Sequence, residues 1–406
     1  MRFFVPLTLP ATAALILALS VMLVSPTQAV ADSTDQAKRI HDRIAGVPPD
    51  SFTLNEMRIE IDDGEPLAAA MIATNDPEFY RVTLKNFAAP WTNRDRSVFV
   101  PLDDYTATII GVVRDNIDFR EILSGDILYI GSGVPAYSTT SNDHYEALEA
   151  QGTDLQANLQ LTSQSGVTGL PEYATAGVIT SRSAAKAFFI DGTNRAMFRF
   201  TMLNHLCLDM EQLQDVTRVP DHIRQDVSRS PGGDSRVFLN SCIGCHSGMD
   251  PLTQALAYYD YEYDAVNDPD ALNGRINYND VGQNDPVTGT RVEEKYFNNN
   301  LNFEQGYITP DDVWANYWRN GRNKLLGWDE SLPATGSGAK SFGRELANSQ
   351  AFAQCQVTKV FENVCLRPPQ DNADRNQVEL MTSSLQSNGY SLRRTFAESA
   401  VYCMGT

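Results

Sequence analysis

One short motif constrains this 406-residue chain more than any other feature: Cys242-Ile243-Gly244-Cys245-His246. Two cysteines separated by two residues and followed at once by histidine form the attachment motif of c-type haem. In that chemistry both thiols add to the vinyl groups of the haem, and the adjacent imidazole becomes an axial ligand of the iron. The motif therefore predicts one covalently bound haem c, held by Cys242, Cys245 and His246, with His246 as the metal ligand.

Other uses of these three residues fit the surrounding sequence less well. A thioredoxin-like pair of cysteines would follow a buried strand, whereas residues 238–241 read Phe-Leu-Asn-Ser, which is a poor strand. A structural zinc site would need a fourth ligand, and the nearest other histidine is His222. A disulfide between Cys242 and Cys245 would leave the adjacent His246 without a role. We therefore favour haem.

The N-terminal residues have the pattern of a secretion signal. Arg2 is followed by an apolar run over residues 11–24 and then by the small residues Ala29-Val30-Ala31. An uncleaved membrane anchor is the alternative, but that run is shorter than the roughly 20 residues that span a bilayer. We expect a signal peptide over residues 1–31, a periplasmic or secreted protein, and no membrane span in the mature chain.

Four further cysteines, Cys207, Cys355, Cys365 and Cys403, suit two disulfides in an exported protein. Apolar spacing predicts a helix over residues 342–365, and ten helical residues would separate Cys355 from Cys365 by about 15 Å. A disulfide requires Cα atoms within roughly 7 Å, so these two should not pair. We favour Cys365 with Cys403 and Cys207 with Cys355, while the other crossing arrangement stays open.

Apolar periodicity predicts a mainly α fold, a helical multi-domain protein with an embedded single-haem c-type cytochrome domain and loop-rich insertions. Residues 32–190 are expected to form an N-terminal helical domain, and residues 191–406 a haem domain with C-terminal helices. A turn-rich excursion is expected over residues 267–302. The spacing predicts helices over residues 67–74, 76–87, 105–114, 118–128, 184–208, 310–320, 342–365, 377–386 and 392–402.

The second axial ligand of the iron is less constrained by the sequence. Met249 follows His246 by only three residues, which places it on the same side of the ring as His246. The better candidates are Met202, His205 and Met210 upstream and Met381 downstream, with an open site as the further alternative. A methionine ligand would raise the reduction potential relative to histidine, whereas an open site would permit oxygen or peroxide chemistry.

The residues around the motif resemble the planctomycete-type cytochrome c family. Residues 242–252 and 255–260 are similar to that family's CxxCH-x-x-[IM]-D-P signature and the A-L-x-x-[FY]-D stretch after it, although Thr253 stands where the family has Gly. The resemblance implies a mostly helical fold with an embedded single-haem domain, and it supports the pairing of Cys207 with Cys355. It also implies that Asp250 and Pro251 shape the turn beneath the haem, with Asp250 as a helix cap.

Single-electron transfer to or from a redox partner protein is the function expected of such a chain. The formal charge of −19 argues against nucleic acid as a partner and is compatible with a basic protein, although solubility alone would explain it equally well. The alternative is a peroxidase- or oxidase-like haem enzyme, because the chain is much longer than a small cytochrome needs. Against an enzyme, Arg195, Arg199 and Arg218 look like surface residues, so no distal His-Arg pair stands out. The oligomeric state stays open.

Overall fold

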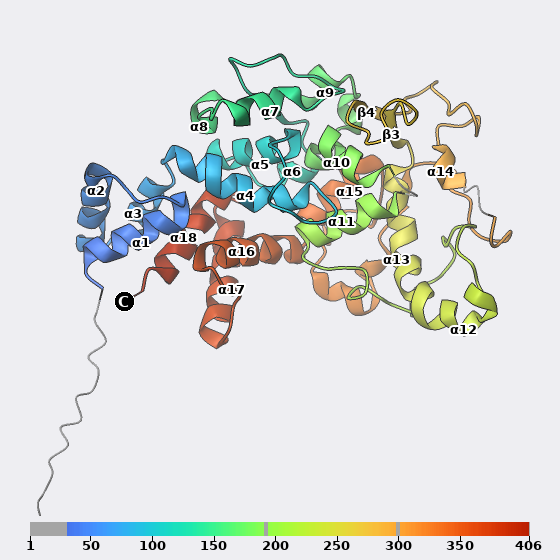
Figure 1. The fold of residues 1–406 in the computed structure, drawn as a ribbon. Coiled ribbons are helices and arrows are strands. Elements are labelled where there is room, and N and C mark those ends of the chain that lie inside the picture. Colours follow the sequence, from blue (N-terminus) through green and yellow to red (C-terminus); the bar gives the residue numbers. More distant parts are fainter. Residues whose placement is uncertain (1–30, 191–193, 298–300, 406) are drawn as a thin grey trace, which may run out of the picture.

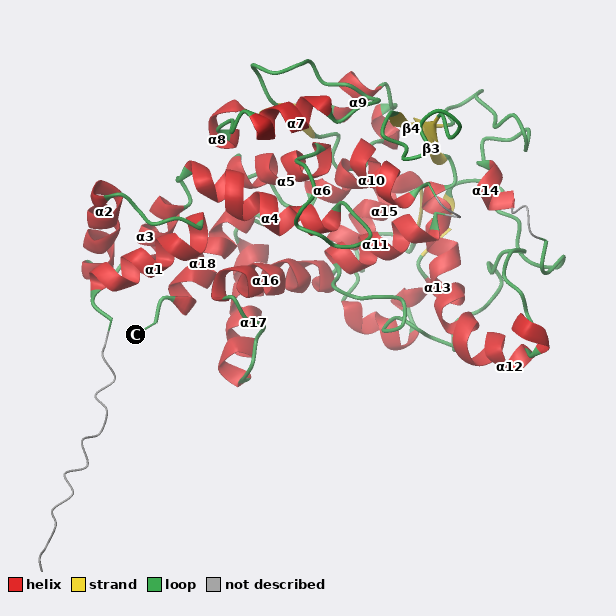
Figure 2. Cartoon of the chain, in the orientation of Figure 1, coloured by secondary structure: helices red, strands yellow, loops and turns green. Residues whose placement is uncertain are grey.

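The computed structural model describes residues 31–190, 194–297 and 301–405. Residues 1–30, which hold nearly all of the predicted signal peptide, lie outside them. The described chain is mainly α-helical, as predicted, with a few short strands (Figure 2). Among the described residues, no helix combines the length and apolarity that crossing a membrane requires.

The first helices pack against the last one at one end of the molecule (Figure 1). Asp32 caps the first helix by accepting from the amide of Asp35, and Gly46 ends it in the left-handed conformation with φ of 76°. Asp50 caps the second helix by accepting two amides. These elements are α1 (Ser33–Ala45), α2 (Ser51–Asp62), α3 (Pro66–Ala73), a π-helical turn (Phe79–Leu84) and α4 (Lys85–Ala88).

A second group of helices forms the middle of the fold, and α5 is buried over nearly its whole length. Adjacent aspartates join two of these helices: Asp103 caps α5, while the Asp104 carboxylate accepts the amides of Arg182 and Ser183 at the start of α10, at 2.7 and 3.1 Å. The group comprises α5 (Asp104–Arg114), α6 (Glu121–Ser124), α10 (Arg182–Phe188), α11 (Arg195–His205) and α15 (Gly338–Ala347).

A small layer covers one side of this middle group. It contains an antiparallel pair in which Leu128 is opposite Thr162. Its elements are β1 (Leu128–Ile130), α7 (Asp143–Ala150), α8 (Leu155–Asn158), β2 (Gln160–Thr162) and α9 (Gln164–Thr168).

The end of the molecule opposite α1 and α2 carries the motif and the loop-rich part of the chain (Figure 1). Two antiparallel pairs lie there, with Tyr259 opposite Tyr278 and Val313 opposite Ser337. The elements are α12 (Ser235–Val237), a π-helical turn (Phe238–Cys242), α13 (Ile243–Thr253), β3 (Tyr259–Tyr263), β4 (Gly274–Tyr278), α14 (Glu294–Phe297), β5 (Val313–Ala315) and β6 (Thr335–Ser337).

Three long helices close the chain: α16 (Gln350–Cys365), α17 (Asn372–Ser387) and α18 (Leu392–Cys403). Cys207 is bonded to Cys355 and Cys365 to Cys403, with Cα–Cα distances of 5.4 and 5.5 Å. The favoured pairing is confirmed, and the crossing alternative is not formed. The second disulfide ties the end of α16 to the end of α18.

Several predicted helices differ from the observed ones. The helix expected over 342–365 is two helices, because Ser349 accepts the amide of Phe352 and starts α16 anew. The prediction of a helix over residues 310–320 is wrong, because strand β5 and a 3₁₀ turn at Tyr317–Arg319 occupy that stretch. The helix expected over 118–128 is reduced to α6, and the stretch 184–208 contains α10 and α11 separately.

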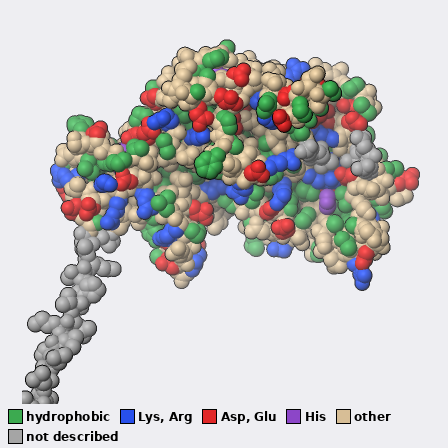
Figure 3. Space-filling model, viewed as in Figure 1, with side chains coloured by type: hydrophobic (Ala, Val, Ile, Leu, Met, Phe, Trp, Pro, Cys, Tyr) green, Lys and Arg blue, Asp and Glu red, His purple; other side chains and the backbone are tan. Residues whose placement is uncertain are grey.

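One continuous cluster of buried apolar side chains, between Ala37 and Ala400, includes residues from both sides of position 190. The expected boundary between residues 190 and 191 stays a prediction. On the face drawn in Figure 3, acidic and basic side chains are interspersed, so the net charge alone identifies no docking surface on that face.

Candidate functional site

The Cys-x-x-Cys-His motif lies at the point where a π-helical turn becomes α13. Cys242 ends the turn and α13 begins at Ile243. Cys242, Cys245 and His246 are related by three and four helical positions, so they share one face of the helix, and all three are partly exposed. The opposite face is held by the chain before it, where the amide of Asp215 donates to the carbonyl of Gly244 at 2.8 Å.

The two cysteines of the motif form no disulfide, whereas the other four cysteines are paired. Cys242 packs against a small apolar cluster of Ile223, Val227 and Phe238, called here the Phe238 cluster. The thiol of Cys245 lies 3.4 Å from the carbonyl oxygen of Met210, to which it donates. Burial, reinforced by the nearby charge of Glu211, raises the pKa of Cys245 to about 11. The Cys245 thiol is therefore protonated at neutral pH.

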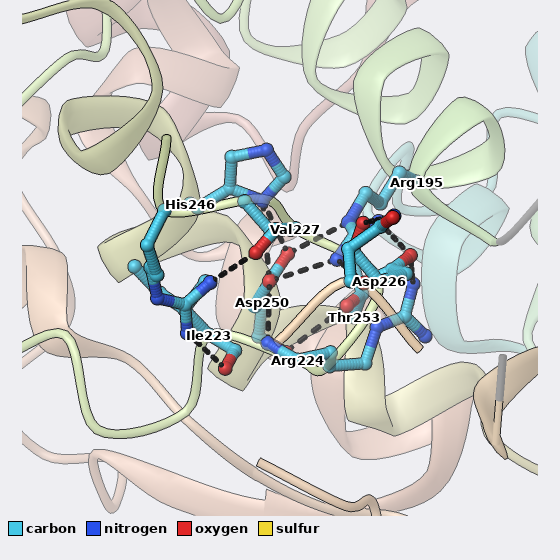
Figure 4. A network of polar contacts seen from close by, with 10 residues as sticks. Arg195, Ile223, Arg224, Asp226, Val227, His246, Asp250 and Thr253 are labelled. Atoms are coloured by element: carbon cyan, nitrogen blue, oxygen red, sulfur yellow. Dashed lines mark hydrogen bonds and ion pairs between the residues drawn. The ribbon is translucent and has the colours of Figure 1, made fainter. Parts of the chain in front are cut away.

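His246 is oriented by a carboxylate one helical turn further along α13. Its Nδ1 lies 3.1 and 3.2 Å from the two carboxylate oxygens of Asp250. Figure 4 shows one ring nitrogen turned toward Asp250 and the other facing away from this group of residues. Because Asp250 occupies Nδ1, Nε2 is the nitrogen that His246 can present to a metal.

Asp250 is fully buried and is bound by arginine as well as by histidine. The guanidinium of Arg195 donates to both oxygens of Asp250, at 2.8 and 2.9 Å, and to both oxygens of Asp226, at 2.6 and 3.0 Å. Burial alone would raise the pKa of Asp250, but the charges of Arg195 and His246 outweigh it and hold that pKa well below its usual range. Asp250 is therefore an anion at every ordinary pH.

Arg224 completes this group of charges, which we call the Arg195 network: Arg195, Arg224, Asp226, His246 and Asp250. Arg224 is buried, and its guanidinium lies 3.5 Å from Asp226 and 4.9 Å from the ring centre of Tyr296. Its three side-chain nitrogens make no hydrogen bond with the described residues. Burial and the charge of Arg195 lower the pKa of Arg224.

Gly248 allows α13 to lie close to the ring of Trp318. A Cβ placed on Gly248 would lie 1.9 Å from Nε1 of Trp318, so only a residue without a side chain lets this ring pack against the helix. Trp318 is itself fully buried. This close contact sets the distance between α13, which carries His246, and the buried Trp318.

Of the predicted distal ligands, Met202 and His205 lie on α11, Met210 follows that helix, and Met381 lies on α17. The ring of His205 is buried beside Trp91, and its Nε2 is 2.8 Å from the hydroxyl of Tyr105. The sulfur of Met381 accepts a hydrogen bond from Ser399 in the C-terminal helices. Met202 is fully buried. Met210 is the candidate whose backbone contacts the motif, through Cys245.

Two residues of the Arg195 network, Arg224 and Asp226, were not expected from the sequence, and two others, Arg195 and Asp250, were expected in different roles. Arg195 was expected at the surface, but it is largely buried between Asp226 and Asp250. Asp250 was expected to cap a helix, but it lies inside α13, whose N-cap is Cys242. Arg195 and Asp226 are 55 and 24 positions from Asp250 along the chain, and no local pattern links them.

A second site-like feature lies away from the motif. A cavity of about 660 Å³ is bordered by side chains of both charges, among them Asp103, Glu146, Arg182 and Lys186. Asp103 is buried there. Burial, together with the charge of the neighbouring Asp104, raises the pKa of Asp103 to about 7.

The donor set around the motif suits haem c: two unpaired thiols and an imidazole on one partly exposed helix face, with Nδ1 already occupied. Among the described residues, no group of three or more His, Cys, Asp and Glu side chains is arranged to hold a metal ion. No protein family, no curated protein and no solved structure matches this chain.

Proposed function

We propose that this chain is an exported c-type cytochrome that binds one haem c through Cys242, Cys245 and His246 and transfers single electrons. One observation carries the proposal: Cys242 and Cys245 form no disulfide, and Nδ1 of the adjacent His246 faces Asp250, which leaves Nε2 for a metal. When bound, haem c supplies an iron that gains and loses one electron.

Each residue of the motif has a distinct part in this proposal. Cys242 and Cys245 hold the haem covalently, each through one thioether. His246 would present Nε2 to the iron, and the Asp250 carboxylate holds the ring by accepting a hydrogen bond from Nδ1–H. The Phe238 cluster, which packs against Cys242, supplies apolar surface next to the attachment point.

A haem enzyme with an open distal position is the second candidate function. The observation in its favour is that His205 and Met381 are engaged elsewhere, the first with Tyr105 and the second with Ser399. If Met202 and Met210 also do not bind the iron, the side opposite His246 would be open to a small molecule.

Absorption spectra and a potentiometric titration of the exported protein separate these two functions. We expect a sharp low-spin spectrum in the reduced form, no change on adding carbon monoxide or peroxide, and a reversible one-electron titration. A high-spin ferric form that binds carbon monoxide after reduction, or reacts with peroxide, would overturn electron transfer in favour of the enzyme. Protein that contains no haem at all would overturn both.

A further inference from the structure

We propose that Asp250 is a positioning residue that lowers the reduction potential of the haem by strengthening electron donation from His246, and that Arg195 limits this effect. The inference rests on the proposed function, because it requires His246 to be an iron ligand.

Asp250 is placed to hold the ring of His246 because the two residues belong to the same helix. Both residues lie on α13, four positions apart, and both carboxylate oxygens are within 3.2 Å of Nδ1. The carboxylate is buried, so water does not compete for it. A ligating histidine that donates its second N–H to a carboxylate becomes a more basic ligand. A more basic ligand favours the ferric iron, and the potential falls.

Arg195 acts on the same carboxylate from the other side. Its Nε and Nη2 donate to the two oxygens of Asp250, and Nη1 and Nη2 donate to Asp226. Because Arg195 donates to the same two carboxylate oxygens, it weakens the hydrogen bond that Asp250 accepts from His246. Arg195 therefore works against Asp250, and the second carboxylate, Asp226, keeps Arg195 in place.

Two substitutions should shift the potential in opposite directions. Asp250→Asn removes the charge that His246 faces, so the potential should rise, with at least a tenfold change in the ferric-to-ferrous ratio, which equals about 59 mV for one electron. Arg195→Lys keeps the positive charge but loses the planar fork that grips Asp250. The reduction potential of Arg195→Lys should therefore be lower than that of the wild type. Asp250→Glu keeps the negative charge, so its potential should lie between those of the wild type and Asp250→Asn.

Asp215→Asn is the matched control for a simple loss of negative charge. Asp215 is a largely buried carboxylate beside the same helix, but its side chain bonds Thr217 and pairs with Arg218 and does not contact His246. In the diamagnetic ferrous protein, the ¹⁵N resonance of His246 Nδ1 should move in Asp250→Asn and stay in place in Asp215→Asn.

The outcomes separate this inference from the proposed function. Wild-type protein without covalent haem would overturn both. Covalent haem with the same potential in Asp250→Asn and wild type, or equal shifts in Asp250→Asn and Asp215→Asn with no change at Nδ1, would overturn the inference alone. If Asp250→Asn does not fold, Arg195→Lys decides, because an unchanged or higher potential in that variant contradicts the proposal.

Discussion

Nδ1 of His246 lies 3.1 Å from Oδ1 of Asp250, one helical turn further along α13. The pair is local in sequence, but the carboxylate is held by Arg195, which begins α11. Orientation of His246 therefore depends on packing between α11 and α13 as well as on the motif itself.

Removal of Arg195 should destabilise the protein far more than removal of an exposed arginine, because it leaves buried carboxylates without a compensating charge. Arg195→Ala leaves Asp226 and Asp250 without their shared partner, and we expect a loss of about 3–5 kcal/mol in the free energy of unfolding. Arg199→Ala is the matched control, because Arg199 is on the same helix and pairs with Asp209 at the surface, where about 1 kcal/mol or less is expected. Urea unfolding measures both, and equal losses would contradict the burial of Arg195.

Gly248 should tolerate no side chain. Gly248→Ala would place a methyl group 1.9 Å from the Trp318 indole, so α13 or the ring must move, with an expected cost of roughly 1–3 kcal/mol or more. Gly244→Ala, on the same helix, approaches Gln214 and Val216 only to 3.3 Å and should cost less. Thermal unfolding of the two variants compares them, and a more damaging Gly244→Ala would show that α13 packs differently.

The two disulfides should differ in what they contribute. In the chain-entropy description, stabilisation grows with the length of the closed loop, and the separations are 148 residues for Cys207–Cys355 and 38 for Cys365–Cys403. Replacing both cysteines of the first pair by alanine should cost about 1 kcal/mol more than replacing the second pair. Urea unfolding of the two double variants gives the difference, and a smaller loss for the 148-residue pair would contradict it.

Asp103 should make the protein less stable as the pH rises. Its pKa is about 7 in the folded chain and 3.8 when unfolded, so the folded state binds the proton more tightly between these values. The stability present below pH 3.8 is lost as the pH rises through 7, by roughly 4 kcal/mol at most. Asp103→Asn keeps a helix cap and removes the titration, so its stability advantage over wild type should grow from pH 5 to pH 8.

Urea unfolding at those two pH values provides the test for Asp103. An equal difference between Asp103→Asn and wild type at pH 5 and pH 8 would show that Asp103 does not titrate in this range. Asp143→Asn, which changes another residue that lines the same cavity, serves as the control for loss of a nearby carboxylate.

Local patterns predicted the parts of the fold that depend on neighbours in the chain. The helices at 105–114, 377–386 and 392–402 were confirmed as α5, α17 and α18, because apolar spacing and caps are local properties. The exclusion of a Cys355–Cys365 bond followed from helical rise alone. In contrast, β5 pairs with β6, about 20 residues later in the chain. The sequence of residues 310–320 alone does not predict that pairing.

The same division applies to the site. The motif and the i, i+4 relation of His246 and Asp250 can be recognised in the sequence. The role of Arg195 could not be, since it depends on two aspartates that reach it only after α11 and α13 pack together. The choice among Met202, His205, Met210 and Met381 as a second ligand of the proposed haem likewise depends on packing between segments that are distant in the sequence.

The proposal of one haem attached at Cys242 and Cys245 is tested most directly by mass spectrometry of the purified protein after proteolysis. We expect a peptide containing residues 242–246 that carries the mass of one haem, and we expect this mass to be absent in Cys242→Ala/Cys245→Ala. Protein with Cys365→Ala/Cys403→Ala should keep it. An unmodified peptide, or one with a Cys242–Cys245 disulfide, from cells that attach haem to other cytochromes would contradict the account.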